Sequence, residues 1–253
     1  MFSVYLLGTA GSGKSSLTSS FSEWLRGKNL NLITVNLDPS VIQLPYSPDV
    51  DVRDFIDIEE IMREYGLGPN GALIFSADMI AEKVEEIKDE IEELRPELIL
   101  VDTPGQMELF TYRSSGPFIV TMLGGSQGIL LFLVDPVLAK RPSDFVSLLL
   151  LGASTQYRFS IPQLNLLSKS DLLSDAEIER LLNWSEDPYE LLEAVREETG
   201  GLRKEVSIEI CRALGQLEVF SILLPVSASR NTGLENLYAE LSRIFWGGED
   251  IGV

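Results

Sequence analysis

Short apolar runs alternate with segments of helical periodicity along most of the chain. Runs such as ELILVD (97–102) and GILLFLVD (128–135) are apolar almost throughout, which is typical of parallel strands covered on both faces. The predicted strands occupy residues 2–7, 30–37, 97–102, 128–135, 162–168 and 219–226. This alternation predicts an α/β fold with a doubly wound, mostly parallel sheet, in which ligands bind beyond the carboxyl ends of the strands.

Two helical insertions interrupt the alternation. Residues 54–94 predict two helices, and the stretch YGLGPNGAL (65–73) between them gathers glycine, proline and asparagine, which are typical of turns. Residues 174–215 predict three short helices before the last strand. No repeat, low-complexity tract or linker marks a boundary, so we expect residues 1–253 to form a single domain that carries both insertions.

Composition and charge narrow the classes of function. The chain is 45% hydrophobic, which fits a folded globular protein, and no apolar run approaches the roughly eighteen residues that a membrane span needs. A formal net charge of -19 argues against broad binding to nucleic acid or anionic lipid, because such binding depends on Lys and Arg neutralising phosphates. The N-terminus lacks the basic segment of a signal peptide, so we expect a cytoplasmic protein.

Histidine is absent, and Cys211 is the only cysteine. A lone cysteine excludes an internal disulfide and a cysteine metal cluster, and we expect it to fill the core. The absence of histidine excludes hydrolases of the Ser-His-Asp type and removes the most common general base. Any catalysis therefore has to use carboxylates, amides, lysine, backbone N–H groups or a bound cation.

A phosphate-binding motif follows the first predicted strand. The stretch GTAGSGKSS (8–16) matches G-x-x-x-x-G-K-[ST], and a helical pattern begins directly after it. Backbone N–H groups would surround phosphate oxygens, Lys14 would reach the β- and γ-phosphates, and Ser15 would offer its hydroxyl to Mg²⁺. The predicted nucleotide contacts of this loop are Gly8, Gly11, Ser12, Gly13, Lys14, Ser15 and Ser16. The motif predicts a P-loop protein that binds a nucleoside triphosphate.

A second phosphate-site motif, DTPGQ, ends the predicted strand 97–102. Asp102 can hold the Mg²⁺ shell through a water molecule, and Gly105 can offer its N–H to a γ-phosphate. Gln106 follows directly, where its amide could orient an attacking water. Glu108 is close enough in sequence to assist, although a solvated acid at a helix start is the favoured interpretation.

Two later motifs indicate which base is bound. The stretch LLSKSD (166–171) resembles the N-K-x-D element of GTPases, in which the Asp carboxylate accepts from guanine N1 and N2 and the Lys stem covers the ring. Lys169 and Asp171 match that element, whereas Ser168 replaces its Asn. Adenine would leave the Asp171 carboxylate unpaired. After the last predicted strand, Ser227 and Ala228 begin an S-A-S sequence that resembles the loop contacting guanine O6 by backbone N–H. Together the motifs favour GTP over ATP.

With these motifs in this order, and Gly-Pro-Asn in the insertion before DTPG, the chain resembles a GPN-loop GTPase. The acidic, insert-poor form resembles archaeal members of this family, which are dimeric P-loop GTPases of the SIMIBI class. The resemblance implies a homodimer in which Gly68, Pro69 and Asn70 reach the nucleotide of the other subunit near its γ-phosphate. It also implies that Asp38, at the end of the second predicted strand, contacts the Mg²⁺ shell or the attacking water. Related dimeric ATPases carry a second Lys where this chain has Thr9.

The implied mechanism is hydrolysis of GTP to GDP and phosphate without a covalent intermediate. Lys14, backbone N–H groups and Mg²⁺ held by Ser15 and, through water, Asp102 would neutralise the phosphates. Asp38 and Gln106 would orient a water in line with the γ-phosphorus. A turn-forming Asp-Pro is the alternative interpretation of Asp38.

Two other functions stay open. A small-molecule or nucleotide kinase would share the phosphate loop, but it needs an arginine-rich lid, and residues 136–160 offer only Lys140, Arg141 and Arg158. In a nucleotide-gated assembly factor, hydrolysis would only reset an apolar binding surface. The apolar stretch 147–160 permits that reading, although such a helix more often belongs to the core. The resemblance implies that the protein has a client protein in the assembly of a larger complex, such as RNA polymerase.

Overall fold

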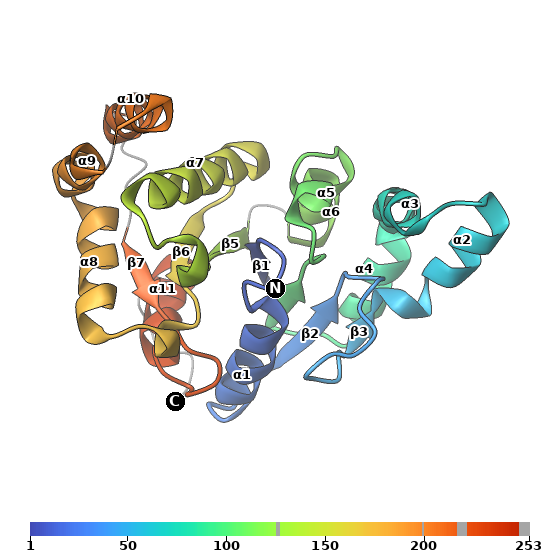
Figure 1. The fold of residues 1–253 in the computed structure, drawn as a ribbon. Coiled ribbons are helices and arrows are strands. Elements are labelled where there is room, and N and C mark those ends of the chain that lie inside the picture. The colour runs from blue at the N-terminus through green and yellow to red at the C-terminus, as the bar shows by residue number, and fades with distance from the viewer. Residues whose placement is uncertain (125–126, 199, 217–221, 248–253) are drawn as a thin grey trace.

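A seven-stranded sheet forms the centre of the computed structural model, which describes residues 1–124, 127–198, 200–216 and 222–247 (Figure 1). Its strands lie in the order β3-β2-β4-β1-β5-β6-β7, and the neighbours pair in parallel. The strands are β1 (Phe2–Gly8), β2 (Leu32–Asn36), β3 (Val50–Asp51), β4 (Leu98–Asp102), β5 (Gly128–Val134), β6 (Gln163–Leu167) and β7 (Leu223–Pro225). The predicted fold class, a doubly wound parallel sheet, is confirmed.

Helices cover both faces of this sheet (Figure 1). They are α1 (Lys14–Arg26), α2 (Ile58–Tyr65), α3 (Pro69–Glu82), α4 (Val84–Glu93), α5 (Met107–Thr111), α6 (Ser115–Gly124), α7 (Pro142–Phe159), α8 (Asp175–Glu186), α9 (Pro188–Glu197), α10 (Leu202–Gln216) and α11 (Leu234–Trp246). Short 3₁₀ turns are η1 (Val52–Asp54), η3 (Pro136–Leu138) and η4 (Ser170–Leu172). Within the described residues, none of these helices combines the length and the apolar character needed to cross a membrane.

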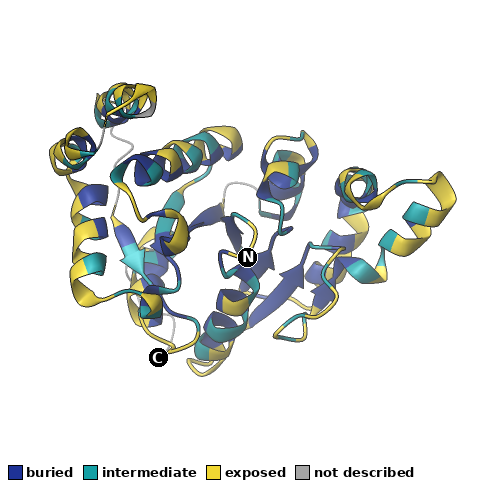
Figure 2. Cartoon of the chain, viewed as in Figure 1, coloured by how far each residue is buried: buried dark blue, intermediate teal, exposed yellow. Residues whose placement is uncertain are grey.

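Each face of the sheet has its own apolar core. Val4 and Leu6 of β1 pack with residues of α1 and α11, whereas Tyr5 and Leu7 belong to the larger core on the other face. Successive side chains of a strand point to opposite faces, so a central strand between two helical layers is buried throughout. Figure 2 shows this as a continuous buried sheet with exposed residues on the outer sides of the helices. The apolar runs of the sequence follow from this double coverage.

The insertion 54–94 differs from the prediction. It contains three helices, α2, α3 and α4, instead of two, and α3 begins at Pro69 inside the predicted turn. Proline fits the first position of a helix because its fixed φ is helical and the N–H that it lacks would have no partner there. Gly66 ends α2 in the left-handed conformation, with φ 63. Pro69 and Asn70 therefore belong to the first turn of a helix and not to a loop.

The strand boundaries also needed correction. The second predicted strand, 30–37, was expected to lead directly into Asp38, but β2 ends at Asn36, whose side chain forms hydrogen bonds with the Asp38 main chain. Strand β3 was not predicted, since two residues carry no alternating pattern. The last predicted strand corresponds to β7, and its residues 219–221 lie outside the described residues. The three helices expected in residues 174–215 are confirmed as α8, α9 and α10.

Gly116, near the start of α6, packs against the backbone that ends α5. A Cβ at this position would lie 1.7 Å from the carbonyl oxygen of Phe110. We expect Gly116→Ala to lower the free energy of unfolding by about 3 kcal/mol, because the backbone has to move apart. Urea unfolding followed by circular dichroism measures this change. Gly200→Ala is the control, because a Cβ there meets nothing within 4 Å; equal stability of the two variants would contradict the prediction.

Candidate nucleotide-binding site

The phosphate loop connects β1 with α1 and takes a conformation that glycine allows. Gly11 and Gly13 have φ values of 75 and 97, in the left-handed region that side-chain-bearing residues rarely adopt. Gly13 is the N-cap of α1 and supplies no side chain, so the N–H groups at this helix start remain directed outward. A helix start of this kind, following a strand and a glycine-rich loop, is suited to phosphate binding.

The Lys14 ammonium lies over the phosphate loop and is held by carbonyl oxygens. Its Nζ donates to Gly8 O at 2.9 Å, to Thr9 O at 3.2 Å and to Gly105 O at 3.5 Å. Burial lowers the pKa of Lys14, while the nearby carboxylates of Asp102 and Asp38 act in the opposite direction. The ammonium thus joins the phosphate loop to the DTPGQ loop. This is the position expected for a lysine that binds a phosphate between the two motifs.

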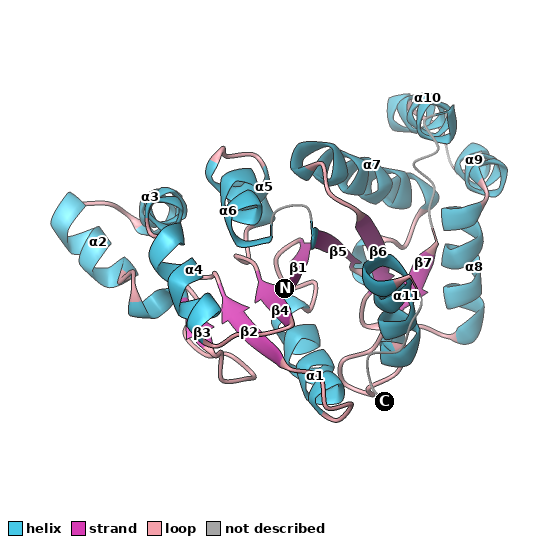
Figure 3. Ribbon diagram, turned by 180° about the vertical axis from the view of Figure 1, so that it is seen from behind, coloured by secondary structure: helices cyan, strands magenta, loops and turns pink. Residues whose placement is uncertain are grey.

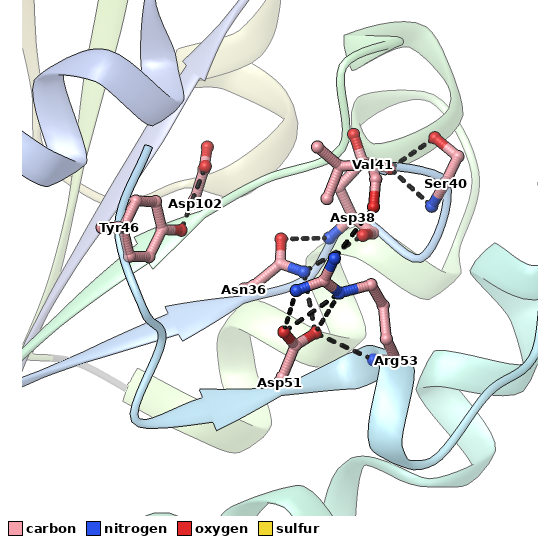
Figure 4. Close-up of polar contacts among 8 residues, drawn as sticks. All are labelled: Asn36, Asp38, Ser40, Val41, Tyr46, Asp51, Arg53 and Asp102. Atoms are coloured by element: carbon pink, nitrogen blue, oxygen red, sulfur yellow. Dashed lines mark hydrogen bonds and ion pairs between the residues drawn. The ribbon is translucent and has the colours of Figure 1, made fainter. Parts of the chain in front are cut away.

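Asp102, at the end of β4, is a buried carboxylate with one free oxygen. Its Oδ2 accepts from the Tyr46 hydroxyl at 3.1 Å (Figure 4). Its Oδ1 has no hydrogen-bond partner among the described residues. Burial raises the pKa of Asp102 to about 6, against the lowering effects of the nearby Ser15 hydroxyl and of the Lys14 charge. A buried acceptor oxygen without a donor, next to the Ser15 hydroxyl, fits the oxygen ligands of a hydrated Mg²⁺ ion.

Asp38 links the loop after β2 to the loop after β4. Its Oδ2 accepts from the Gly105 N–H at 2.8 Å, and its Oδ1 accepts from the N–H and hydroxyl of Ser40 at 2.9 and 2.6 Å (Figure 4). Gly105 N–H is the group that the sequence predicted for a γ-phosphate oxygen. The Asp38 carboxylate therefore accepts the hydrogen bond of the N–H that the sequence predicted for a phosphate.

Gln106 lies beside this link. A cavity of about 110 Å³ is lined by Asp38, Gly105 and Gln106 on one side and by Leu73 and Ala77 of α3 on the other. Glu108, in the first turn of α5, is exposed, in keeping with the interpretation as a solvated acid. The structure thus brings together five residues predicted for the phosphate end of the site, namely Lys14, Asp38, Asp102, Gly105 and Gln106.

The base motifs form a separate cavity of about 260 Å³ between the start of α1 and the loops after β6 and β7. Lys169 and Asp171 line it together with Gly13 and Ala228. The Lys169 stem lies along the phosphate loop, since a Cβ on Gly13 would be 3.7 Å from its Cε. Its Nζ pairs with Asp135 Oδ2 at 2.8 Å, which holds the stem against the cavity. The cavity lies between this stem and the loop after β7.

Asp171 is held as a hydrogen-bond acceptor. Ser227 Oγ donates to its Oδ1 at 2.5 Å, and hydrogen bonds from Ser227 and Ser229 lower the pKa of Asp171. An ionised carboxylate suits the paired N1 and N2 donors of guanine. Ser168 also lines the base cavity, but its hydroxyl donates to Val134 O at 3.1 Å. This hydrogen bond joins the end of β6 to β5. At the same position, the N-K-x-D element of GTPases has the amide of an Asn.

Asn70 does not join these residues within the chain. Gly68, Pro69 and Asn70 are exposed, and Figures 1 and 3 show from opposite sides that the junction of α2 and α3 lies well to one side of the start of α1. Asn70 shares a helix face with Leu73 and Ala77, the two residues of α3 that line the cavity at Asp38. Asn70 therefore continues this face of α3 toward the first turn of the helix.

The sequence reasoning missed two residues of the site. Tyr46 lies in the irregular stretch LPYSPD, where no pattern indicates that its hydroxyl returns to Asp102. Asp135, which pairs with Lys169, follows the apolar strand β5 directly. A carboxylate immediately after a buried parallel strand is a signal that could have found it.

Known proteins are similar to this chain over nearly its whole length. A family described as "Conserved hypothetical ATP binding protein" matches residues 6–245. The chain is 35% identical over 236 residues to GPN-loop GTPase PAB0955 of Pyrococcus abyssi, which covers 92% of this chain and 93% of that protein. The crystal structure of PAB0955 in its apo form gives a TM-score of 0.86 at 33% identity and covers 97% of this chain and 98% of the other. The chain belongs to the GPN-loop GTPase family.

Members of this family differ in length. The chain is 28% identical over 244 residues to GPN-loop GTPase 1 of Dictyostelium discoideum, and this match covers 94% of the chain but 60% of that relative. The family description names ATP, whereas the curated relatives are named GTPases. The fixed acceptor Asp171 in the base cavity agrees with the curated names. The chain is accordingly a GTP-binding GTPase.

Base selection gives the first test of the site. We expect Asp171→Asn to lose affinity for GTP by at least about tenfold and to gain affinity for xanthosine triphosphate, because an amide donates where the carboxylate accepts. Competition of both nucleotides against a fluorescent GDP analogue measures this exchange. Asp175→Asn, at the exposed start of α8, should bind like the wild type. Unchanged GTP preference in Asp171→Asn would mean that the base lies elsewhere.

Proposed function

We propose that this GTPase acts as a homodimer that hydrolyses GTP to GDP and phosphate and so switches a surface used in the assembly of a larger protein complex. The observation that supports it best is the hydrogen bond between the Asp38 carboxylate and the Gly105 N–H, next to Lys14. It joins an acid suited to orienting water with two groups suited to binding the γ-phosphate.

In this proposal the triphosphate lies along the phosphate loop, with its base between Lys169 and Ala228. Lys14 and the outward N–H groups of the loop neutralise the phosphate oxygens. The Gly105 N–H turns from Asp38 to the γ-phosphate when GTP binds. The released Asp38 carboxylate and the Gln106 amide then hold a water in line with the γ-phosphorus. Attack by this water breaks the bond between the γ-phosphorus and the bridging oxygen, giving GDP and phosphate.

Mg²⁺ fits the residues next to the phosphate loop. The Ser15 hydroxyl and, through water, the buried Asp102 carboxylate would hold it, and Asp38 is near enough to share its shell. The described residues hold no cluster of three or more acidic, histidine or cysteine side chains for a metal, so phosphate oxygens would complete the coordination. When bound, the ion neutralises charge on the phosphates. The hydrogen bond from the Tyr46 hydroxyl holds the Asp102 carboxylate in place for this role.

Asn70 is proposed to act on the nucleotide of the other subunit. Helix α3 begins without a side-chain cap and without an acidic residue in its first turn, so its positive end is open to an anion. The Asn70 amide and the neighbouring N–H groups would donate to the γ-phosphate across the dimer. A neutral amide should stabilise the transferring group less than an arginine does. Thr9, where related ATPases have a second lysine, leaves room for this donor.

A dilution series of the wild type and Asn70→Ala tests the trans arrangement. We expect GTP, but not ATP, to be hydrolysed, and the specific activity of the wild type to fall on dilution. Asn70→Ala should bind GTP like the wild type but hydrolyse it at least about tenfold more slowly, because one transition-state donor is lost.

Asn183→Ala, on the exposed side of α8, is the matched control and should keep wild-type activity. Activity of Asn70→Ala equal to that of the wild type at every concentration would remove Asn70 from the mechanism. A defect of Asn70→Ala with no dependence on dilution would show instead that Asn70 acts within its own chain.

The surface that contacts a client is proposed to lie on the insertion 174–215. A groove of about 300 Å³ between α9 and α10 is lined by Pro188, Leu192 and Cys211, with Tyr189 exposed beside it. The alternative surface on α7 has fewer exposed apolar side chains than the sequence suggested. Leu148, Leu149 and Phe159 are buried, and Leu150 and Tyr157 are the large apolar residues of α7 that stay exposed.

Peptide capture tests this part of the proposal. We expect the forms bound to GDP and to a non-hydrolysable GTP analogue to differ at least about fivefold in affinity for an apolar peptide library, because a switch requires differential binding. Leu192→Asp should abolish that difference, and Leu150→Asp should not. Equal capture by the two forms would leave a GTPase without a switched surface.

A further inference from the structure

An ion pair at the end of β3 lies behind the Asp38 loop. Arg53 donates from Nε to both carboxylate oxygens of Asp51 at 3.0 Å and from Nη2 to Oδ2 at 2.6 Å (Figure 4). Asp51 also accepts from the Arg53 N–H at 3.0 Å as the N-cap of η1, which turns the arginine back over its partner. The Asp51 side chain is 11% exposed. No role of this pair follows from the sequence motifs.

The pair reaches Asp38 through Asn36. Parallel pairing places Asn36 opposite Asp51 at the ends of β2 and β3, and Asn36 Nδ2 donates to Asp51 Oδ1 at 2.9 Å. The same amide donates to Asp38 O at 3.1 Å and accepts from Asp38 N–H at 3.0 Å. Both main-chain groups of Asp38 are therefore fixed by one buried side chain, whose orientation is set by Asp51.

Arg53 holds the far side of the same segment. Its Nη1, the guanidinium nitrogen that does not bind Asp51, donates to Val41 O at 3.0 Å (Figure 4). Residues 38–41 are thus tied at their start by Asn36 and at their end by Arg53, and both ties depend on Asp51. An arginine fork can bind a carboxylate with two nitrogens and a carbonyl with the third, which a lysine cannot do.

We propose that Asp51 and Arg53 are positioning residues for GTP hydrolysis, which hold segment 38–41 so that the Asp38 carboxylate faces the Gly105 N–H and the γ-phosphate site. This inference rests on the proposed role of Asp38. With its main chain fixed, Asp38 can exchange the Gly105 N–H for a water by rotation of its side chain alone. Without the clamp, the irregular connection 37–49 would have to be ordered at each turnover.

The charges of the pair are consistent with a rigid clamp. Burial acts to raise the pKa of Asp51, but hydrogen bonds from Arg53 and Asn36 outweigh it and hold that pKa below its ordinary value. The hydrogen bond to Asp51 in turn raises the pKa of Arg53. Both groups stay charged over the working range of pH, so the clamp does not release by titration near neutrality.

The clamp is tested with Arg53→Gln, Arg53→Lys and a matched control. Arg26→Gln removes another arginine-aspartate pair, 2.9 Å to Asp49, at the opposite end of connection 37–49. We expect Arg53→Gln to lower kcat at least about tenfold while the affinity for GDP stays within about twofold, since misplacement of a reacting group affects turnover more than binding. Arg53→Lys, which keeps the charge beside Asp51, should retain the fold yet show most of the loss in kcat. Arg26→Gln should keep wild-type kcat.

A second experiment measures the order of segment 38–41 directly and does not depend on activity. Hydrogen exchange of a peptide covering residues 38–41 should be faster in Arg53→Gln than in the wild type, in the GDP form of each. Arg26→Gln should leave the exchange of this peptide unchanged. Wild-type exchange together with wild-type kcat in Arg53→Gln would overturn the inference.

A double-mutant cycle with Asp38→Asn separates this inference from the proposed function. If Arg53 acts through Asp38, adding Arg53→Gln to Asp38→Asn should cause little further loss, less than about twofold. Additive losses would mean that Arg53 does not act through Asp38 and would overturn the inference alone. If Asp38→Asn by itself keeps wild-type kcat, the proposed role of Asp38 fails, and the inference fails with it.

Discussion

Lys14 carries its ammonium into a buried part of the molecule, and the surrounding loops are arranged to compensate for that charge. Carbonyl oxygens from the phosphate loop and from Gly105 accept its hydrogen bonds, and Asp102 lies at the same edge because β1 and β4 pair in parallel, with Leu6 opposite Asp102. A buried charge without partners would be strongly unfavourable. The parallel pairing of two central strands therefore brings the phosphate loop and the DTPGQ loop together at one edge of the sheet.

The candidate nucleotide site has two halves, one on each side of β1. The base cavity is fixed by Lys169 paired with Asp135 and by Asp171 held by Ser227, all at the ends of strands in one half of the sheet. On the other side of β1, the Asp38 carboxylate accepts from the Gly105 N–H, the group that the sequence predicted for a γ-phosphate. This hydrogen bond satisfies the N–H within the chain and joins the loop after β2 to the loop after β4.

The sequence predicted which residues the structure brings together around Lys14, because each motif there is local and follows a strongly apolar strand. The GPN stretch was harder. Proline and glycine favour a turn and a helix start equally, and α3 packs its second turn against the cavity at Asp38, which only the folded chain reveals. The contacts of Tyr46 with Asp102 and of Arg53 with Val41 could not be predicted, since they join irregular segments through side chains without any repeating pattern. Strand β3, which orders one of these contacts, is too short to give a periodic signal.

The two edges of the sheet also restrict how copies of the chain can associate. In the described part of the chain, β3 at one edge has two residues and β7 at the other has three, the last of them Pro225, which has no N–H to offer. Edges this short present too few free backbone groups for a strand of a second molecule to pair with. Within the described residues, the sheet therefore offers no long edge that a second molecule could extend. If copies of the chain associate through these residues, helical faces are the surfaces available, and their relative orientation can shift with a bound ligand far more easily than a ladder of backbone hydrogen bonds can.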